Sequence, residues 1–395
     1  MLVYDTIIIG AGAAGLLCAI EAGNRNRTVL LLDKAEKAAK KILISGGGRC
    51  NFTNLTSNAN AYLSRNPHFC KSALARYTQW DFIALVEKHG LSWTEKTLGQ
   101  LFCDQKSKAI VEMLIAECKD ADVNIQTNCI IEDIQKDHAL FTLKSSIGKL
   151  QAQSLVIATG GPSIPRMGST DFGIRISKQF GLKNIAFTPA LVPFTFPQVE
   201  LDDLFKPLAG TSTEVEVSTH RQKISFREAM LFTHRGLSGP AILQISSYWQ
   251  KGDRLYINLF PDNDALSWLE KQQNQHPKTE LKTRLNQHLP KKLAHKLCEK
   301  QLTSKPMQQY SPTEIEYLAS QLSHWELIPS GTEGMRTAEV CTGGVDTDEL
   351  SSKTFESKKV AGLYFIGETI DVTGHLGGYN FQWAWSSGWC AGQFV

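Results

Sequence analysis

The sequence predicts an α/β protein whose parallel sheet is assembled from both ends of the chain, with a second domain inserted between them. Three observations predict this class. A strand, a glycine-rich turn, a helix and a second strand occupy residues 3–32. Another strand, glycine loop and helix follow one another between residues 360 and 390. Between these segments, strands punctuated by prolines and then polar helices replace the pattern.

The N-terminal elements are predicted from side-chain type and periodicity. Val3–Ile9 is rich in β-branched residues and ends at a glycine, which predicts a buried strand. Leu16, Leu17 and Ile20 lie on the apolar side of a helix predicted over 13–23, and 28–32 is a second buried strand. A strand, helix and strand within about 30 residues make a parallel β-α-β unit.

The later elements follow in order along the chain. Helices are predicted over 70–89 and 105–121, and strands over 123–128, 130–133, 139–145 and 155–158. Then come a hairpin of 214–218 with 221–226, a strand at 255–259, proline-broken helices through 263–321, a strand at 360–366 and a helix at 382–390. We therefore expect a nucleotide-binding domain made of 1–187 and 331–395, and an inserted domain over 188–330. The insertion is expected to be β-rich over 188–260 and helical over 261–325.

Composition and cysteine spacing limit the function classes. Forty-two Lys and Arg stand against 39 Asp and Glu, which leaves a net charge of +3 and gives no bulk argument for a nucleic acid or a membrane surface. The nine cysteines form no C-x-x-C pair, which disfavours a dithiol or zinc centre, and we expect no metal site. The odd count and the absence of a basic leader predict a reducing, cytoplasmic location.

The first glycine turn has the spacing of a dinucleotide-binding fingerprint. Gly10-Ala11-Gly12-Ala13-Ala14-Gly15 is G-x-G-x-x-G, and it follows a predicted strand and opens a predicted helix. In this motif the glycines allow a tight turn, close approach of a pyrophosphate and close packing of the helix on the sheet. The helix N-terminus offers free N–H groups to the phosphates. Asp33 ends the second strand, where an acid can hydrogen-bond ribose hydroxyls. These features predict a Rossmann-like domain.

Two further segments favour FAD over NAD as the bound dinucleotide. Ala158-Thr159-Gly160-Gly161 ends a buried strand, where the backbone can pass close to a cofactor. Gly367, Glu368 and Asp371 follow the strand at 360–366 and precede a glycine loop and a helix. A flavin needs such protein groups around its ring to set its electronics. Only one fingerprint is visible, so we expect NAD(P)H to be a transient co-substrate without a domain of its own.

Three longer segments carry a family resemblance. The run Ser45-Gly46-Gly47-Gly48-Arg49-Cys50-Asn51, the run from Thr233 to Pro240 and the run from Gly377 to Ala384 resemble motifs of the BaiN/YhiN-like flavoproteins. The matches are spread over nearly the whole chain. The resemblance implies FAD-containing, NAD(P)H-linked oxidoreductases with a Rossmann-like FAD domain and an inserted domain of β-barrel plus helices. The chain departs from the family at Ala39, where the family tends to have glycine and therefore more backbone freedom.

The resemblance and the fingerprint together give an expected set of FAD contacts, and we expect the FAD to be bound non-covalently. The set is Gly10, Gly12, Ala13, Ala14, Gly15, Asp33, Lys34, Lys41, Ser45, Gly46, Gly48, Arg49, Cys50, Asn51, Ile131, Ala158, Thr159, Gly160, Gly161, Gly367, Glu368, Asp371, Gly377, Gly378, Tyr379 and Asn380.

Three residues are candidates for chemistry, each with a structural alternative. Arg49 can stabilise negative charge on a reduced flavin or a substrate carboxylate, or it can cap backbone carbonyls. Cys50 is either a reactive thiol near the flavin or, as free cysteines more often are, buried and inert. His234 can donate a proton to the substrate, or it can organise its loop through backbone hydrogen bonds.

One charged segment bears on the partner. Eight basic residues between 276 and 305 face only Glu280 and Glu299, so the local excess is +6: Lys278, Lys282, Arg284, Lys291, Lys292, Lys296, Lys300 and Lys305. No aromatic residues interleave with them, which favours a solvated helical face over an RNA contact.

The favoured function is therefore an FAD-dependent, NAD(P)H-linked oxidoreductase of a small organic molecule. Nucleic acid is expected to be an unlikely partner, a membrane is not expected, and the sequence gives no oligomeric state. Two alternatives stay open. One is a flavin-dependent RNA-modifying or RNA-binding protein that uses the basic face at 276–305. The other is a non-catalytic flavin redox sensor.

Overall fold

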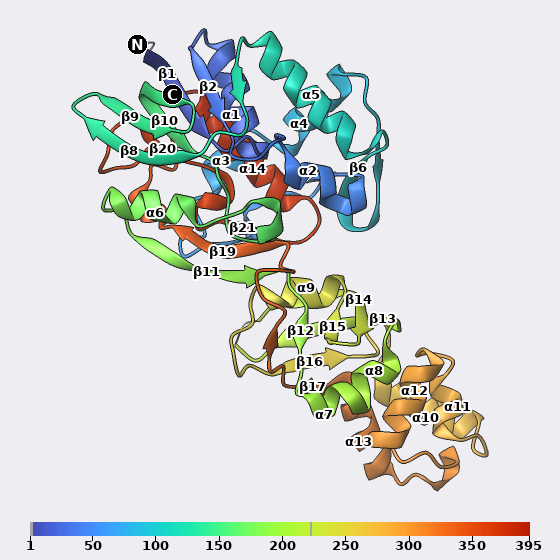
Figure 1. Cartoon of the computed structure of the whole chain (residues 1–395). Helices are drawn as coiled ribbons and strands as arrows, with labels where there is room; N and C mark the ends of the chain where they lie inside the picture. The colour runs from blue at the N-terminus through green and yellow to red at the C-terminus, as the bar shows by residue number, and fades with distance from the viewer. Residues whose placement is uncertain (1–2, 222) are drawn as a thin grey trace. The chain divides into compact units, whose positions relative to one another are not determined.

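The computed structural model describes residues 3–221 and 223–395, and it divides the chain into two compact units (Figure 1). Unit 1 comprises Met1–Thr188 and Val340–Val395, and unit 2 comprises Pro189–Glu339. The chain thus leaves unit 1 and returns to it once, and both of its ends belong to unit 1. The return lies at 339/340 rather than at the expected 330, because β18 (Gly331–Thr332) still pairs with β12 (Phe194–Thr195) of unit 2.

The core of unit 1 is a seven-stranded mixed sheet centred on β10 (Gly148–Ile157). β10 pairs in parallel with β1 (Val3–Ile9) and, near its end, with β20 (Leu363–Phe365). β2 (Val29–Leu32) and β7 (Asn124–Gln126) continue the parallel part beyond β1. The first half of β10 pairs with β9 (Leu140–Ser145) and β9 with β8 (Ile131–Asp137), both antiparallel. The carboxyl ends of β1, β2, β10 and β20 therefore share one edge, where ligands bind in such sheets.

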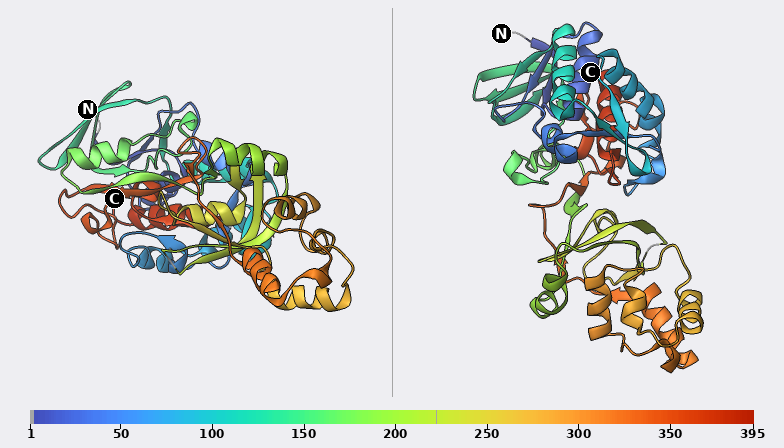
Figure 2. Two further views of the ribbon diagram at one scale, coloured as in Figure 1. Left: turned by 90° about the horizontal axis from the view of Figure 1, so that it is seen from below. Right: turned by 90° about the vertical axis from the view of Figure 1, so that its right-hand side faces the viewer.

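The two ends of the chain meet in a pair of packed helices. α1 (Ala13–Asn24) packs against α14 (Tyr379–Gly392), and α5 (Lys106–Asp120) covers another side of α1. Figures 1 and 2 show the red C-terminal helix beside the blue N-terminal helix in each view. Gly388 allows this contact, because a Cβ there would collide with the carbonyl oxygen of Ala14. The predicted β-α-β unit and the C-terminal helix are confirmed.

The segment between β2 and β7 forms a small layer of its own. It contains α2 (Lys40–Ile44), the 3-10 turn at Ser45–Gly48, and a three-stranded antiparallel sheet in the order β3 (Asn51–Asn54), β6 (Gln100–Cys103), β5 (Trp93–Glu95). The predicted helix over 70–89 is two helices, α3 (Lys71–Arg76) and α4 (Gln79–Lys88). The break follows from Thr78 and Asp81, whose capping box starts a new helix.

The remaining elements of unit 1 are short. They are β4 (Tyr62–Leu63) paired with β21 (Thr373–Gly374), α6 (Phe172–Gln179), and β11 (Asn184–Ala190) paired with β19 (Val340–Val345). The strand predicted over 360–366 shortens to β20, because Gly362 has a φ of 74° and the backbone turns before it.

Unit 2 combines a sheet and a group of helices. Its seven strands pair antiparallel in the order β17 (Trp325–Leu327), β16 (Leu255–Asn258), β13 (Ser212–Thr219), β14 (Ser225–Thr233), β15 (Gly236–Ser238), β12, β18. This strand order has β17 and β18 at its two edges. We expected a β-barrel, which is a closed sheet without edges. α9 (Pro240–Ser246) packs on β13 and β14. The second hairpin strand begins at Ser225 and not at 221, and residue 222 of the expected range lies outside the described residues.

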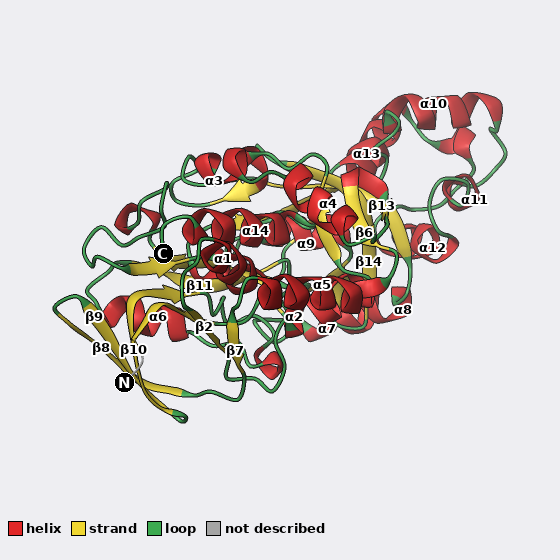
Figure 3. Cartoon of the chain, turned by 90° about the horizontal axis from the view of Figure 1, so that it is seen from above, coloured by secondary structure: helices red, strands yellow, loops and turns green. Residues whose placement is uncertain are grey.

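The helices of unit 2 follow the predicted polar stretch. They are α10 (Ala265–Gln275), α11 (Leu281–Leu285), α12 (Lys291–Lys300) and α13 (Pro312–Ser323), shown in red in Figure 3. Two very short helices, α7 (Gln198–Glu200) and α8 (Lys206–Leu208), precede β13. Within residues 3–221 and 223–395, no helix combines the length and apolar character needed to cross a membrane.

Candidate functional site

The turn from β1 to α1 has one open glycine between two packed ones. A Cβ at Gly10 would collide with the carbonyl oxygen of Ala158, and a Cβ at Gly15 would collide with that of Gly10. Gly10 also has a φ of 110°, which favours glycine. A Cβ at Gly12 would meet no protein atom within 4 Å. Gly12, the N-cap of α1, therefore borders space that a phosphate group can enter at a helix N-terminus.

Asp33 stands beside this turn at the end of β2. Its two carboxylate oxygens accept hydrogen bonds of 2.8 Å from the backbone N–H groups of Ala11 and Ala35. The carboxylate that can hydrogen-bond a ribose therefore also holds the glycine turn in place by hydrogen bonds. The backbone N–H groups of Asn128 and Cys129 donate to the carbonyls of Ala35 and Asp33, which brings the start of β8 at Ile131 toward this side. Lys34 is exposed.

Ala39 occupies the position where the related sequences tend to have glycine. It adopts a left-handed conformation with φ 61°, although it is buried, and its N–H donates to the carbonyl of Ala11 at 2.8 Å. The hydrogen bond to the glycine turn holds a conformation that alanine ordinarily avoids.

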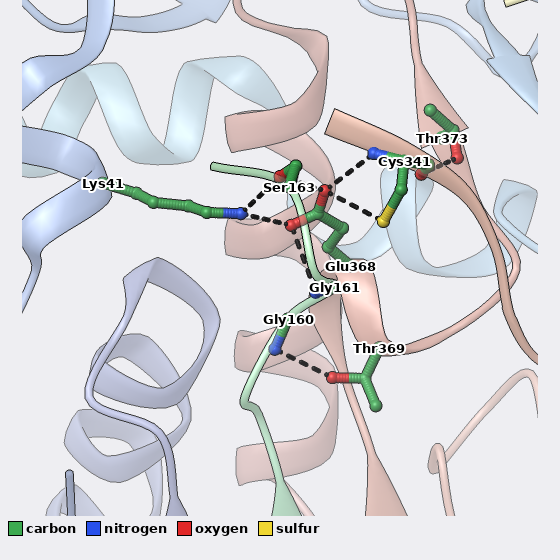
Figure 4. Close-up of polar contacts among 8 residues, drawn as sticks. All are labelled: Lys41, Gly160, Gly161, Ser163, Cys341, Glu368, Thr369 and Thr373. Carbon is green, nitrogen blue, oxygen red and sulfur yellow. Dashed lines mark hydrogen bonds and ion pairs between the residues drawn. The ribbon is translucent and has the colours of Figure 1, made fainter. Parts of the chain in front are cut away.

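Glu368 is the centre of a polar cluster that joins four segments distant in sequence (Figure 4). Its carboxylate accepts a 2.8 Å charge-assisted bond from the Lys41 ammonium, which also donates to the Ser163 hydroxyl at 2.8 Å. The backbone N–H groups of Gly161 and Cys341 donate to the same carboxylate at 3.3 and 3.1 Å. The cluster therefore ties α2, the segment after β10, β19 and the loop after β20 together.

These contacts decide the charge state of Glu368. Burial pushes its pKa upward, but the Lys41 ammonium and the backbone N–H groups of Cys341 and Gly161 outweigh burial and hold the pKa below its usual value. Burial, followed by the negative charge of Glu368, raises the pKa of the Cys341 thiol well above its usual value. The site therefore holds a carboxylate, an ammonium and a protonated thiol.

Sequence reasoning missed Ser163, Cys341 and Thr369. Ser163 follows the predicted 158–161 turn by two residues, so its position carried a usable signal. Thr369 accepts a 3.2 Å hydrogen bond from the N–H of Gly160 and directly follows Glu368. Cys341 had no local signal, since it reaches the cluster from β19. A Cβ at Gly161 would collide with its sulfur, so the glycine is required by this contact.

Hydrogen bonds of Asn51 and Asn54 join the glycine loop at 45–51 and β3 to the glycine loop at 374–380. The Asn54 amide donates to the carbonyl of Gly377 at 2.9 Å, and Asn51, with its amide oriented to satisfy its neighbours, accepts from the N–H of Gly378 at 3.2 Å. A Cβ at Gly378 would collide with the carbonyl of Thr53. Within the second loop, Asn380 bonds both the N–H and the carbonyl of Gly374. The two loops thus form one rigid surface.

Tyr379 and Asp371 complete this surface. The Tyr379 hydroxyl lies 2.9 Å from the Thr56 hydroxyl, and the Tyr379 carbonyl accepts from Tyr62 at 3.0 Å. Asp371 is buried and accepts a 2.8 Å hydrogen bond from the N–H of Arg65, yet burial dominates and raises its pKa. Both residues therefore attach this part of the chain to the segment of residues 56–65.

The 45–48 turn exposes bare backbone. Gly46, Gly47 and Gly48 have φ values of 55°, 66° and 82°, which three successive glycines allow without strain. Gly46 packs on the Phe102 ring, whereas a Cβ at Gly47 or Gly48 would meet no protein atom within 4 Å. A flat ring can therefore approach this turn. Arg49 is exposed, with its guanidinium 5.8 Å from the centre of the Phe102 ring.

Cys50 differs from Arg49 in being fully buried. Burial raises the pKa of its thiol to about 12, and its N–H donates to the carbonyl of Ser45 at 3.1 Å. A thiol with this pKa is protonated at neutral pH and is a poor nucleophile. The arrangement favours the inert alternative for Cys50.

The residues fit a flavin dinucleotide. The open backbone at Gly12, Gly47 and Gly48 borders space on the carboxyl edge of the sheet. Among the described residues, the buried Oγ1 of Thr159 has no hydrogen-bond partner, which leaves a polar atom free for a ligand at the end of β10. Lys41, Glu368 and the loop backbones offer donors and acceptors for phosphate, ribityl and ring atoms. No group of three or more His, Cys, Asp and Glu in residues 3–221 and 223–395 could hold a metal ion.

The comparison with known families agrees with this geometry. The HI0933-like protein Rossmann domain matches residues 4–394. This chain belongs to the HI0933-like family. Unit 1 is therefore a Rossmann-type FAD-binding α/β domain, and the chain is a flavin-dependent oxidoreductase of that family.

Relatives of the HI0933-like chain carry two kinds of name. It is 53% identical over 391 residues to "Ribosomal RNA dihydrouridine synthase" of Escherichia coli K12, covering 99% of this chain and 97% of the relative. The protein of that name from Haemophilus influenzae Rd is 48% identical, with 98% and 97% covered. "3-dehydro-bile acid delta(4,6)-reductase" of Clostridium scindens is 30% identical, with 98% and 97% covered.

These relatives overturn one expectation. We expected nucleic acid to be an unlikely partner, and this is wrong, because the names of two relatives at 53% and 48% identity imply an RNA substrate. The near-neutral net charge misled the interpretation, since it averages over the whole surface of the protein.

A solved structure also resembles the HI0933-like chain. The 3-ketosteroid-delta4-(5alpha)-dehydrogenase from Rhodococcus jostii RHA1 covers 98% of this chain and 96% of its own, at 14% identity and a TM-score of 0.49. At this similarity we draw no functional argument from it.

Two sequence-predicted features lie in unit 2 of the HI0933-like chain. His234 is exposed in the turn between β14 and β15, so it belongs to a different unit from Arg49 and Cys50. In the basic segment, Lys282, Lys300 and Lys305 form ion pairs with Glu280, Asp203 and Glu314, respectively. Lys296 also pairs with Asp203 and with Glu299. Half of the eight basic residues of that segment are therefore neutralised by neighbouring acids.

Proposed function

We propose that this chain reduces a uridine of ribosomal RNA to dihydrouridine, with non-covalent FAD as cofactor and NAD(P)H as the electron donor. The observation that carries the proposal is the 53% identity over 99% of the chain to a protein named ribosomal RNA dihydrouridine synthase. An RNA substrate also agrees with a cytoplasmic protein. The proposed substrate is therefore one base of a large RNA and not the small organic molecule expected from the sequence.

The reaction balances with one nicotinamide per uridine. Dihydrouridine is uridine whose C5=C6 double bond has gained one hydride and one proton. The hydride comes from NAD(P)H and the proton from solvent or a protein acid, and NAD(P)+ is the by-product. When bound, FAD supplies the two-electron carrier between donor and base.

The residues of this chain bind and orient the cofactor in the proposal. Gly12 and the start of α1 receive the pyrophosphate, and Asp33 receives the adenosine ribose. Lys41 and Glu368 offer a donor and an acceptor at the carboxyl edge of the sheet. The backbone of 46–48 would hold the flavin ring. Arg49 stands exposed beside it, where a guanidinium can stabilise negative charge.

A second candidate is the reduction of a carbon–carbon double bond in a polycyclic small molecule. The relative named as a bile acid reductase, at 30% identity over almost the whole chain, favours it. The identity to the RNA-named relatives is higher at equal coverage, so we place RNA first.

The test starts from purified protein loaded with FAD. Ribosomal RNA from cells that lack this gene is incubated anaerobically with the holoprotein and either NADH or NADPH, and its nucleosides are quantified by mass spectrometry. We expect dihydrouridine to rise only when protein, nicotinamide and RNA are all present. A flavin that is reduced and reoxidised while uridine stays intact would overturn the proposal, and turnover of an unsaturated 3-oxosteroid in the same assay would favour the second candidate.

A further inference from the structure

The turn between β5 and β6 presents an apolar side chain to solvent in an unusual backbone conformation. Leu98 has a φ of 59° and its residue surface is 61% exposed. Left-handed leucine costs about 1–2 kcal/mol, and an exposed leucine gains nothing from burial. Neither property stabilises the isolated protein. Backbone strain of this kind clusters at sites where the protein contacts a ligand or partner.

Hydrogen bonds hold this turn beside the glycine loops. The Asn54 amide nitrogen donates both to the carbonyl of Leu98 at 3.0 Å and to the carbonyl of Gly377 at 2.9 Å. A Cβ on Gly377 would stand 3.1 Å from the side chain of Gln100, the first residue of β6. One buried asparagine therefore connects the exposed leucine directly to the loop at 374–380. The position of Leu98 is fixed relative to the candidate flavin site.

Two cations lie at the Phe102 ring of the same hairpin. The Lys96 ammonium lies 4.2 Å from the centre of the Phe102 ring, and the Arg49 guanidinium lies 5.8 Å from it. Neither group forms an ion pair with the described residues. Glu95 is the only acid in segments 44–54, 93–103 and 374–380, and the next acid, Asp104, accepts a 2.7 Å hydrogen bond from the Thr94 hydroxyl. The surface next to Leu98 can therefore accept the phosphates of a nucleic acid.

A base inside folded RNA cannot reach a flavin while it is stacked. Enzymes that modify such bases move the base out of the stack, and apolar side chains commonly fill the gap that remains. Unstacking costs a few kcal/mol, which the inserted side chain and phosphate contacts offset. A single exposed leucine, two residues from Lys96 and next to the cofactor loops, has the chemistry for this task.

We propose that the β5–β6 turn is the element of unit 1 that enters the RNA: Leu98 takes the place of the extruded uridine, while Lys96 and Arg49 bind the flanking phosphates. This inference rests on the proposed function, because it requires an RNA substrate. It adds the surface that receives the RNA and the residue that opens the stack.

The first test replaces Leu98 by asparagine, which tolerates the left-handed conformation and removes the apolar side chain. Ile147→Asn is the matched control, since Ile147 is 46% exposed in the β9–β10 turn. That turn lies at the opposite end of β10 from the 158–161 segment. We expect Leu98→Asn to lower kcat on structured ribosomal RNA about tenfold and to have a smaller effect on an unstructured uridine oligonucleotide. Leu98→Met should retain most of the activity.

The second test concerns the phosphates. Lys96→Ala and Arg49→Ala should each weaken RNA binding and reduce the slope of log affinity against log salt by about 0.7. Lys149→Ala, in the same turn region as Ile147, should leave the slope unchanged. FAD content and the thermal unfolding midpoint of each variant show whether the fold is intact.

The outcomes separate this inference from the proposed function. If the parent protein forms dihydrouridine and Leu98→Asn performs equally on structured RNA, the role of Leu98 is overturned. Equal losses on structured and unstructured RNA also contradict base extrusion by Leu98. If the parent protein forms no dihydrouridine in any RNA, the proposed function itself has failed, and the inference fails with it.

Discussion

The Lys41 ammonium and the Glu368 carboxylate lie 2.8 Å apart, although 327 positions separate the two residues in the sequence. Their side chains are 33% and 20% exposed, so water screens the pair only in part. The pair connects α2, in the N-terminal part of unit 1, to the loop after β20, in its C-terminal part. It therefore joins the two parts of unit 1 at the edge of the sheet where a dinucleotide binds.

Removing the Lys41 charge should destabilise the protein in a pH-dependent way. Lys41→Met leaves Glu368 without its cation, and we expect a loss of about 1–3 kcal/mol in the free energy of unfolding at pH 7. The pKa of Glu368 is below its usual 4.5 in the parent protein. The stabilisation is therefore present above pH 4.5 and is lost as the pH falls through the folded pKa.

The measurement is urea unfolding of the two proteins from pH 7 down to pH 3. Lys40→Met serves as the control, because the described structure gives Lys40 no ion pair. A gap between parent and Lys41→Met that stays constant to pH 3 would show that the pair does not act through the charge of Glu368. Addition of Glu368→Gln to Lys41→Met should restore part of the loss.

Gly12 and Gly15 should respond differently to the same methyl group. Gly12→Ala should lower the stability of the FAD-free protein by less than about 1 kcal/mol, because the Cβ meets no protein atom and only the N-cap preference is lost. It should weaken FAD binding about tenfold or more, since the methyl group occupies the space for the phosphates. Gly15→Ala should destabilise the FAD-free protein by about 1–3 kcal/mol, because its Cβ collides with the Gly10 carbonyl.

Chemical unfolding of the FAD-free proteins and fluorescence titration with FAD give both quantities. FAD binding by Gly12→Ala at the parent affinity would contradict the assignment of the phosphate site to this turn.

The local pattern of the sequence was enough to predict the first β-α-β unit, α5 and α14 of unit 1, but not the small sheet of β3, β6 and β5. The strand at Val3–Ile9 agrees with its prediction at both ends, and the helix predicted over 13–23 extends one residue further. These elements depend on β-branched runs and glycine positions that are visible within a few residues. The separate helices α3 and α4 could also have been foreseen, because Thr78 and Asp81 have capping-box spacing.

The long-range contacts of the site could not be predicted from local patterns. Cys341 reaches Glu368 because β19 returns from unit 2, and no spacing rule indicates that return. The hydrogen bonds from Asn54 to Leu98 and Gly377 join three segments that only the folded sheet brings together. The partner was misjudged because net charge averages over the whole surface of the protein.

Cys50 should be dispensable for chemistry. Its pKa of about 12 keeps the thiol protonated, so Cys50→Ala should retain the parent rate of flavin reduction and of product formation within about twofold. Loss of the buried sulfur should lower stability by about 1 kcal/mol. Rates measured with equal amounts of FAD-loaded protein separate the two effects. A loss of a hundredfold or more in kcat with normal FAD content would restore Cys50 as a catalytic residue.

His375 should lower the free energy of unfolding as the pH falls from 6.5 to 4. Burial lowers the pKa of His375 from 6.5 to about 4, so the folded protein resists protonation that the unfolded chain accepts. Above pH 6.5 both states are neutral and the residue contributes nothing. As the pH falls from 6.5 to 4, the unfolded state is increasingly favoured, by up to about 3 kcal/mol. His375→Gln should abolish this slope, so the free energies of unfolding of parent and variant should diverge below pH 6.5. Parallel curves between pH 7 and 4 would show that His375 titrates normally in the folded protein, and an NMR titration of its ring protons would then give a pKa near 6.5.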